Sequence, residues 1–547
     1  MPKIVLEHVT KRWGNYYGVD DLNLVIDDNS FITLLGPSGC GKTTTLRMIA
    51  GLETPTSGRI TIGDTVVFDS QALINVPASK RRVGFLFQNY ALWPNMTVYQ
   101  NISFGLKNIK EELPLIDFTH LANAQKISVL KDHLEELTAF AHELEAKSKD
   151  KKDMRLRAYT KIVDAYQVSM MSAKYLASVA LGHKAAEEIS RLIAENAAIE
   201  QKYAAKGIAL NEKGELCQGE KVLTKVRKLS DEEVDLAVRR VARVVKVGEF
   251  MDRYPAELSG GQQQRVAIAR TLAPGPKVLF MDEPLSNLDA KLRLEMRSEL
   301  KRLHADTGAT FVYVTHDQLE AMTLATKICL INNGVLQQYD PPLEIYHRPA
   351  NLFTADFIGT PSINLVEAKG KVNASGQLEL DIWDGHKVLF TPREKGFDLA
   401  AARQAALANV RAETPTKANK DGPFNYTIPV IDNELDTGEE KEATAEDFVL
   451  GIRSEYLTIN GGGTLDSIVY SAMPTGKETT IRLEVGNYLL TGDIFGAIDY
   501  PIGAKVELGF SGHHVMLFDR KTQKLLTLGA LEVAPAKPKR TAAKAKK

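Results

Sequence analysis

Two stretches of the chain, residues 1–108 and 229–355, alternate between short apolar runs and helical spacing. The runs FITLLG (31–36), KVLFMDEP (277–284) and ATFVYVTHD (309–317) each end in a glycine or a polar turn. After the first of them, the apolar residues of TTTLRMIAGL recur at the spacing of one helix face. Apolar strands that precede polar turns, with helices between them, predict an α/β core over these two stretches.

Residues 109–228 have a different pattern, rich in Lys, Glu, Ala and Leu. Six apolar residues are separated by steps of three and four in the manner of a heptad seam: Ile127, Leu130, Leu134, Leu137, Ala141 and Leu144. A second periodic stretch runs from about Met154 to Tyr203. We therefore expect a long antiparallel hairpin of two helices, each roughly 45–75 Å long at 1.5 Å per residue.

After residue 355 the pattern changes to short alternating segments separated by Gly and Asn turns. This pattern predicts small β units over residues 356–533, interrupted by a helix at 399–413. Ser230 to Glu233 form a predicted capping box where the second α/β stretch resumes. The tail, 534–547, holds six Lys or Arg and no acid, and we expect it to be disordered.

Composition excludes several classes of protein. The chain has 68 Lys plus Arg against 69 Asp plus Glu, a formal net charge of −1, so a general affinity for nucleic acid is not implied. Its hydrophobic fraction of 44% is too high for a disordered chain. Three Cys in 547 residues exclude a disulfide scaffold and suit a reducing compartment.

The sequence also lacks the features of a membrane-inserted protein. No stretch approaches 18 apolar residues without a charge, and the first residues, MPKIVLEHVTK, do not resemble a secretory leader. We expect a cytosolic protein, which needs a separate membrane subunit if it acts at a membrane.

The strongest motif is G-x-x-x-x-G-K-T between a predicted strand and a predicted helix, as a phosphate-binding P-loop requires. It spans Gly36 to Thr43. Glycines allow consecutive backbone N–H groups to converge on phosphate oxygens, and the following helix adds a positive field. Lys42 would reach the β- and γ-phosphates, and the Thr43 hydroxyl would bind Mg²⁺. Because Cys40 lies at this helix N-terminus, we expect a lowered pKa and a reactive thiol, unless it only fills space.

Two further motifs carry polar groups at strand and helix ends. The strand ending in Asp282 and Glu283 places one carboxylate to hold Mg²⁺ and the next to act as general base toward water. Such a pair is weak evidence alone and strong evidence beside a P-loop. The segment Leu258 to Arg265, LSGGQQQR, offers a second anion site at a helix N-terminus or an ordinary N-cap.

The P-loop, LSGGQ, the strand ending in Asp-Glu and a later strand ending in His316 occur in the order found in the ATP-binding subunits of ABC transporters. The chain resembles that family over about 1–108 and 229–355. The resemblance implies an ATPase with a P-loop NTPase core in two parts, 1–108 and 229–355, split by the helical insertion 109–228. It also implies a C-terminal regulatory β-barrel of OB or TOBE type over 356–533.

The resemblance also implies roles for individual residues. The catalytic residues would be Lys42, Glu283 and His316, the last as the switch histidine near the γ-phosphate. Mg²⁺ would be held by Thr43, Gln88 and Asp282. The ATP contacts would be Trp13, Gly36, Pro37, Ser38, Gly39, Cys40, Gly41, Lys42, Thr43, Thr44, Gln88, Ser259, Gly260, Gly261, Gln262 and Asp289. Trp13 would stack on adenine, although a core role for this aromatic residue is an alternative.

The same resemblance predicts partners. Two subunits of this family sandwich each nucleotide between the P-loop of one and the LSGGQ of the other. The resemblance therefore implies a second ATP-binding subunit, which we expect to be another copy of this chain in a homodimer with a two-fold axis. Two membrane permeases and, indirectly, an extracytoplasmic solute-binding protein are also implied. The chain would then be peripheral, at the cytoplasmic face of the membrane.

Within the family, four segments of the chain resemble the carbohydrate-import branch. They are EPLSNLDAKLR, YALWPNMTV, GIRSE (451–455) and VMLFD (515–519). Importers of polyamines, iron and sulfate share this layout. Ser454 stands where the branch usually has Pro, and Asn95 where it often has His. A rival of another class is an SMC-like or DNA-repair ATPase, which also has coiled coil between the two motifs. The importer-like C-terminal region and the short insertion oppose it, and a non-catalytic scaffold is opposed by the complete set of catalytic residues.

Overall fold

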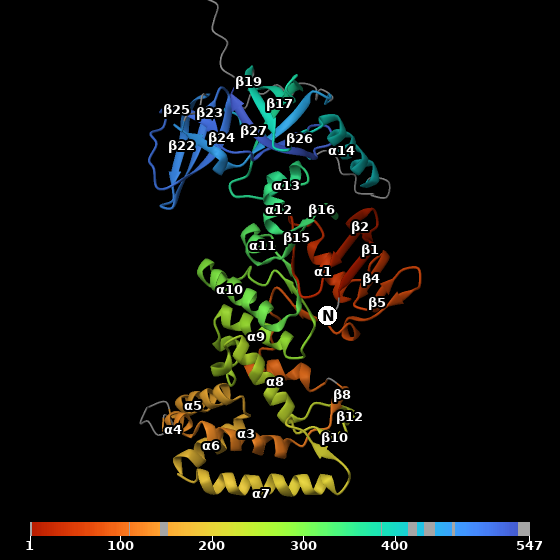
Figure 1. Ribbon diagram of the computed structural model, residues 1–547, viewed down its shortest axis with the longest axis vertical. Helices are drawn as coiled ribbons and strands as arrows, with labels where there is room; N and C mark the ends of the chain where they lie inside the picture. The colour runs from red at the N-terminus through yellow and green to blue at the C-terminus, as the bar shows by residue number, and fades with distance from the viewer. Residues whose placement is uncertain are drawn as a thin grey trace, which may run out of the picture. The chain divides into compact units, whose positions relative to one another are not determined.

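The computed structural model describes residues 3–108, 110–142, 151–383, 385–413, 424–431, 443–461 and 465–533 (Figure 1). The tail that we expected to be disordered, 534–547, lies outside the described residues. The chain divides into two compact units, one of residues 78–312 and one of residues 2–77 together with 313–547. Each unit contains buried apolar clusters of its own.

The second unit begins with an antiparallel sheet whose strand order is β2-β1-β4-β5-β6. Its strands are β1 (Ile4–Trp13), β2 (Tyr16–Ile26), β4 (Ser57–Ile62), β5 (Thr65–Asp69) and β6 (Ile74–Asn75). A tight turn joins β1 to β2, so that Trp13 at the end of one strand pairs with Tyr16 at the start of the next.

The phosphate-loop motif lies between a buried strand and a helix, as the sequence predicts. All five residues of β3 (Phe31–Leu35) are buried, and α1 (Lys42–Ala50) begins within the motif. Strand β15 (Lys327–Asn332) runs parallel to β3 and pairs with β16 (Val335–Asp340) in an antiparallel hairpin. The remaining helices of this part are α11 (Gln318–Leu324), α12 (Pro342–His347) and α13 (Leu352–Phe357).

The C-terminal part of this unit is a closed β-barrel beside a second antiparallel sheet, as expected for an OB- or TOBE-like regulatory domain (Figure 1). The barrel contains β17 (Asn364–Val372), β18 (Leu378–Ile382), β19 (His386–Pro392), β27 (Leu525–Val533), β26 (Val515–Asp519) and β20 (Asp447–Ile452). The sheet contains β21 (Leu457–Ile459), β25 (Lys505–Phe510), β22 (Leu465–Pro474), β23 (Glu478–Val485) and β24 (Tyr488–Phe495). One apolar cluster includes residues of both. The predicted helix at 399–413 is α14 (Leu399–Glu413).

The first unit carries the other sequence motifs. Strand β7 (Gly84–Leu86) pairs in parallel with β13 (Val278–Asp282), which ends at the acidic pair. Its helices outside the insertion are α2 (Val98–Leu106), α8 (Asp231–Val244), α9 (Gly260–Leu272) and α10 (Ala290–Thr307). The predicted capping box of Ser230 and Glu233 is present at the start of α8. Along the chain, β14 (Thr310–Val314) leads from this unit into the other.

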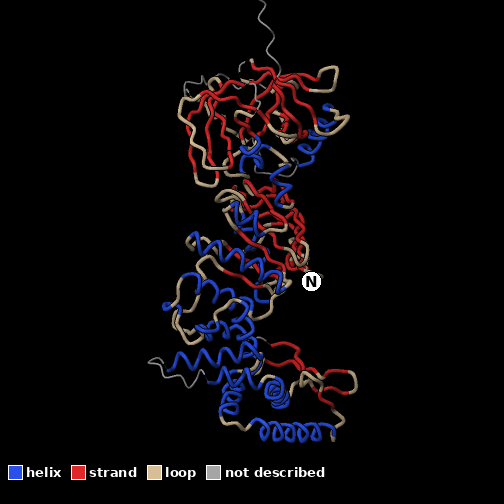
Figure 2. The backbone as a smooth tube through the Cα atoms, turned by 60° about the vertical axis from the view of Figure 1, so that its left-hand side comes forward, coloured by secondary structure: helices blue, strands red, loops and turns tan. Residues whose placement is uncertain are grey.

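The insertion is helical, but the predicted hairpin of two long helices is wrong. In the described part of the insertion, five helices of 9 to 20 residues take its place: α3 (Phe118–Asp132), α4 (Leu134–His142), α5 (Lys151–Tyr166), α6 (Met170–Leu181) and α7 (Ala185–Ala204) (Figure 2). The chain breaks at His133 (φ −134°), and at Gln167 and His183, which both have a φ of 53°. The seam residues Leu130, Leu137 and Ala141 are buried in a compact core with residues of α5 and α6. Leu144 lies outside the described residues.

Short strands complete the insertion. β8 (Lys110–Pro114) pairs with β12 (Thr224–Lys228), so the chain enters and leaves the insertion through one antiparallel ladder. A small sheet follows α7, made of β9 (Ala209–Leu210), β10 (Leu216–Gln218) and β11 (Lys221–Val222).

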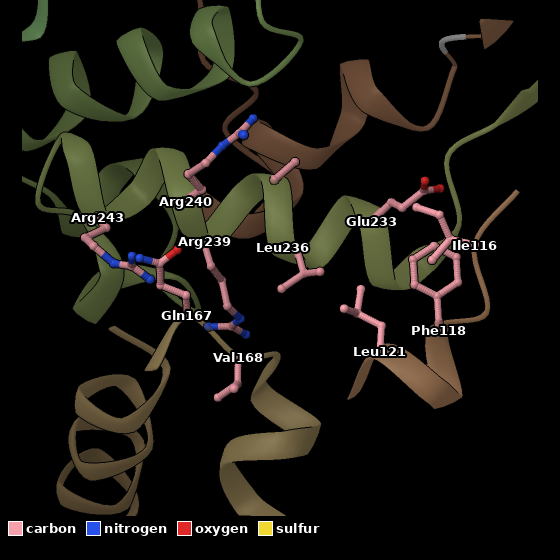
Figure 3. A pocket seen from close by; sticks show the side chains of 11 residues that line it. Ile116, Phe118, Leu121, Gln167, Val168, Glu233, Leu236, Arg239, Arg240 and Arg243 are labelled. Atoms are coloured by element: carbon pink, nitrogen blue, oxygen red, sulfur yellow. The ribbon is translucent and has the colours of Figure 1, made fainter. Parts of the chain in front are cut away.

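A cleft of about 280 Å³ lies between α8 and the insertion (Figure 3). Phe118 and Leu121 line one end together with Glu233, and Arg239 and Arg243 lie toward the other end. Arg243 Nε donates to the Asp164 carboxylate of α5 at 3.2 Å. The insertion is therefore attached to α8 by polar contacts around a cleft.

Candidate nucleotide-binding site

The phosphate loop, Gly36–Thr43, owes its path to two glycines that other backbone segments approach closely. A Cβ atom at Gly36 would lie 2.0 Å from the carbonyl oxygen of Ile331, and one at Gly41 would lie 2.1 Å from that of Gly18. Both glycines have a positive φ, 151° and 101°, which disfavours other residues. Ser38 and Gly39 at the tip of the loop are exposed, and Pro37 is half-buried. A phosphate-binding loop needs this arrangement, in which Gly36 and Gly41 pack against the backbone behind the loop and the tip is open to a ligand.

Lys42 is buried in this loop, with 6% of its surface exposed. Its Nζ donates hydrogen bonds to the carbonyl oxygens of Gly36 (2.8 Å) and Pro37 (2.7 Å). Neutral carbonyl groups hold the ammonium without cancelling its charge, so the loop keeps a positive field for an anion. Thr43 and Thr44 are half-buried in the first turn of α1, beside this lysine.

The reactive thiol expected at Cys40 is contradicted. Cys40 is buried, with 4% of its surface exposed, and burial raises the pKa of its thiol. The neighbouring charge of Lys42 acts in the opposite direction and is the smaller effect. The lowered pKa expected from the position at a helix N-terminus is therefore wrong, because the effect of burial is larger.

Trp13 is an exposed aromatic residue at the end of β1, with 47% of its surface accessible. Its ring is stacked with that of Tyr16 at a centroid distance of 6.2 Å, and Lys11 Nζ lies 5.1 Å from the ring centroid. Trp13 is therefore not a core residue, which leaves it accessible to a planar base. Sequence reasoning missed Tyr16, although the letters NYY after the turn were a possible signal.

His316 is exposed at the end of β14, between two residues with fixed positions. Thr315 donates from its hydroxyl to the buried Glu320 carboxylate at 2.7 Å, and Asp317 caps α11 by accepting from the backbone N–H of Leu319 at 2.8 Å. The backbone on either side of the histidine is thereby held. Glu320, 3% exposed, was not predicted from the sequence.

Within the other unit, the structure brings Gln88 and Glu283 together. Gln88 Nε2 donates to the Glu283 carboxylate at 3.3 Å, and Asn287 Nδ2 donates to the carbonyl oxygen of Gln88 at 3.0 Å. Glu283 has a φ of 45°, a conformation that non-glycine residues rarely adopt and that turns it away from the strand direction. Asp282, the last residue of β13, is 5% exposed.

The segment after Gln88 is fixed by an arginine that the sequence did not reveal. Arg270, in the last turn of α9, donates to the carbonyl oxygens of Tyr90 (2.8 Å) and Ala91 (2.7 Å), and its guanidinium lies 5.0 Å from the Trp93 ring centroid. Tyr90 and Ala91 both have a positive φ, 60° and 47°. Burial lowers the pKa of Arg270. The last turn of α9 thus holds the loop that begins at Gln88.

The LSGGQ segment forms the N-terminus of α9. Ser259 accepts from the backbone N–H of Gln262, and the Gln262 side chain accepts from that of Ser259, which is a complete capping box. A Cβ at Gly261 would lie 2.5 Å from a methyl of Leu292 in α10. Gly260 is the first residue of α9, and Asp289 caps α10 by accepting a hydrogen bond from the backbone N–H of Leu292 at 2.9 Å.

The predicted site residues are thus divided between the two units. Trp13, the phosphate loop with Thr44, and His316 belong to one, and Gln88, Asp282, Glu283, Ser259–Gln262 and Asp289 to the other. Among the described residues, no three His, Cys, Asp or Glu side chains form a preformed metal cage. Within the same residues, no helix has the length and apolar character needed to cross a bilayer.

Comparison with known proteins identifies the family. The ABC transporter family profile matches residues 19–286. The chain is 30% identical over 527 residues to the trehalose/maltose import ATP-binding protein MalK of Thermococcus litoralis, covering 96% of this chain and 100% of the relative. It is 33% identical to the maltose/maltodextrin import ATP-binding protein MalK of Salmonella typhimurium, over 73% of this chain and 75% of that protein. The xylose/arabinose import ATP-binding protein XacJ of Haloferax volcanii is 37% identical over 67% of this chain and 63% of its own length. The chain belongs to the ATP-binding, ATP-hydrolysing subunits of ABC transporters.

Proposed function

We propose that the chain powers the import of sugars or sugar-like solutes by coupling ATP hydrolysis to membrane permeases. The observation that carries this proposal is the similarity to the Thermococcus litoralis trehalose/maltose import protein over that relative's whole length. The β-barrel that follows the ATPase motifs supports the same branch. Import of a polyamine, iron or another small solute is the alternative, since such importers share the layout.

The residues of this chain fit ATP and Mg²⁺. Lys42 and the backbone of the phosphate loop bind the phosphates, with the loop's open tip facing the ligand. Thr43, Gln88 and Asp282 are the oxygen donors proposed for Mg²⁺, which prefers to be held by one or two protein groups and substrate phosphates. When bound, the ion offsets the negative charge that develops on the phosphates.

Glu283 is the general base in this proposal. The hydrogen bond from Gln88 holds its carboxylate, and Glu283 itself has a positive φ just after the last residue of β13. A positioned carboxylate accepts a proton from water as the water attacks the γ-phosphate. His316, on a backbone anchored by Thr315 and Asp317, stabilises the phosphate that leaves.

A second copy completes the site. Because the capped N-terminus of α9 and the phosphate loop are separate anion-binding elements, we propose that Ser259–Gln262 and Asp289 act on the nucleotide bound by the other subunit of a homodimer. ATP binding closes the dimer, and hydrolysis opens it. Two permeases at the cytoplasmic face of the membrane, reached through the loop after Gln88, and indirectly a solute-binding protein, convert this motion into transport.

The rival proposal of an SMC-like ATPase loses its structural basis, because the described part of the insertion is a compact helical body and not an extended coiled coil. No nucleic-acid partner is proposed.

The Glu283→Gln variant tests the mechanism. We expect it to keep ATP affinity, to lose turnover by roughly 10²- to 10⁴-fold and to accumulate as an ATP-bound dimer. Glu295→Gln on the exposed face of α10 is the matched control, expected to hydrolyse ATP normally. ATPase rates, equilibrium ATP binding and gel filtration with ATP distinguish the variants. Near-normal turnover in Glu283→Gln would show that Glu283 is not the general base. Unchanged ATP affinity in Lys42→Ala would show that ATP does not bind at the phosphate loop.

A further inference from the structure

The hairpin that carries Trp13 is connected to the phosphate loop through Tyr16. Trp13 and Tyr16 are paired across the end of the β1–β2 hairpin, and their rings are inclined by only 20°. The Tyr16 hydroxyl donates to the carbonyl oxygen of Gly39 at 3.3 Å. Both rings are exposed, at 47% and 59%. The hydrogen bond therefore joins the aromatic pair to the tip of the phosphate loop.

Gly18 provides a second connection, made by close packing. It is buried on β2, and a Cβ atom at this position would lie 2.5 Å from the Trp13 ring. Its carbonyl oxygen is the atom that a Cβ at Gly41 would meet at 2.1 Å. The backbone at Gly18 thus separates the Trp13 ring from Gly41 by the thickness of one peptide strand.

A third connection runs through the turn between β15 and β16. The backbone N–H of Gly334 donates to the carbonyl oxygen of Cys40 at 3.0 Å, and that of Asp20 donates to the carbonyl oxygen of Gly334 at 2.9 Å. These bonds join β2 to the phosphate loop independently of any aromatic side chain. The hairpin and the loop are held together at three places.

We propose that Tyr16 and Gly18 are positioning residues for the nucleotide, which set the distance and tilt of the Trp13 ring relative to the phosphate loop. The inference rests on the proposed ATP site. A ligand with a planar base and a chain of phosphates can bind the Trp13 ring and the phosphate loop together only if their spacing matches the length of the ligand. A fixed spacing lowers the entropy that is lost when the ligand binds both. Base and phosphates are then recognised as one unit, and the base contributes fully to affinity.

Moving the Trp13 ring should weaken only the part of the ATP affinity that comes from the base. A methyl group at Gly18 meets the end of an exposed side chain, so the Trp13 ring moves while the fold is kept. We expect Gly18→Ala to weaken ATP binding by roughly the same factor as Trp13→Ala, about 5- to 150-fold for loss of one stacked base. Tyr16→Phe keeps the ring and loses the bond to Gly39, for which about a 2- to 10-fold loss is expected.

The experiment compares equilibrium binding of ATP with that of inorganic tripolyphosphate, which lacks the base, by titration calorimetry on the full chain. Gly18→Ala and Trp13→Ala should lose ATP affinity with tripolyphosphate affinity unchanged, and the double variant should lose no more than Trp13→Ala alone. Gly105→Ala, where a methyl group meets nothing within 4 Å, is the control for the substitution itself. Thermal unfolding checks that each variant is folded, and Tyr16→Phe carries the test if Gly18→Ala does not fold.

Each outcome is decisive. If Trp13→Ala weakens ATP binding and both Gly18→Ala and Tyr16→Phe match the wild type, the positioning role is overturned and the ATP site stands. Equal losses for ATP and tripolyphosphate in Gly18→Ala would also overturn it, because Gly18 would then shape only the phosphate loop. If Trp13→Ala has no effect, the proposed stacking fails, and the positioning role fails with it.

Discussion

Replacing Arg453 with methionine should loosen the packing of α12 and α13 against the barrel. The guanidinium of Arg453 is 1% exposed and donates to the carbonyl oxygens of Tyr346 (3.1 Å), Ala355 (2.9 Å) and Ile358. It also lies 4.3 Å from the Tyr346 ring centroid. The last carbonyls of a helix have no partner within it, so one buried arginine caps the ends of two short helices.

The size of the effect follows from these contacts. Methionine leaves three carbonyl groups without this donor, those of Ala355 and Ile358 buried and that of Tyr346 partly buried, at about 1–3 kcal/mol each, or roughly 3–9 kcal/mol in total. Against this, removing a buried cation recovers several kcal/mol of desolvation, the same effect that lowers the pKa of Arg453. We expect a net loss of about 3 kcal/mol, which lowers the unfolding midpoint by roughly 6–12 °C in a domain of 150–250 residues. Arg453→Lys keeps the charge without the planar guanidinium, so its unfolding midpoint should lie between those of the wild type and Arg453→Met.

Thermal unfolding followed by circular dichroism measures the shift, and limited proteolysis shows whether the barrel is released first. Arg482→Met is the matched control, a half-buried arginine on β23. The reasoning is refuted if Arg453→Met unfolds within about 2 °C of this control, because the three carbonyl groups would then have found other donors.

Two further predictions concern the barrel and the insertion. Burial, together with nearby positive groups, lowers the pKa of His514, so its folded-state pKa lies below the unfolded value of 6.5; stability is complete above that pH and is lost as the pH falls through the folded pKa. His514→Phe, which keeps the stack on Tyr456, should flatten the difference between urea unfolding at about pH 7.5 and pH 5.5, and an unchanged difference would exclude His514. Replacing residues 112–224 with a short Gly/Ser linker should leave a folded, active ATPase, because the described core of the insertion is its own; failure to fold or to bind ATP would show that the insertion belongs to the core.

The groups that surround His514 determine the sign of the first of these effects. His347, Arg393 and His513 disfavour its charged form, and Glu455 favours it. Burial and these three positive neighbours together outweigh Glu455, so the folded protein binds a proton at His514 more weakly than the unfolded chain does.

Sequence patterns predicted the fold well where a motif or a turn marks the boundary. The helix at 399–413 and the capping box at Ser230 have the bounds that the letters predicted. The hairpin failed because steps of three and four show only that one helix face is buried. They do not show where a helix ends. Gln167 follows the end of α5 in a left-handed conformation without being glycine or asparagine, so no letter signalled that break. Gly182, which caps the end of α6, was a letter at which the periodic pattern weakens.

The candidate site shows the same limit at the level of single residues. Motif spacing marks Lys42 and Glu283 as candidates, because their proposed chemistry follows from residue type. The raised pKa of the Cys40 thiol comes from burial in the folded chain, and Arg270 acts on backbone carbonyl oxygens, which every residue possesses. Neither property can be read from a pattern of side chains.

The ladder between β8 and β12 bears on how a segment such as 109–228 can be inserted into a chain. Lys110 pairs directly with Lys228, so the two ends of the segment are neighbours before anything outside it contributes. Closing a flexible loop of this length would oppose folding by about 4 kcal/mol, and here the segment meets that requirement within its own fold. Such a junction favours exchange of the whole segment, because another domain whose termini lie one strand spacing apart fits the same two chain ends. The contacts that the segment makes to α8, such as that of Asp164 with Arg243, would be lost. The phosphate loop, the LSGGQ segment and the strand that ends at Asp282 all lie outside this segment, so its exchange leaves the nucleotide motifs unchanged.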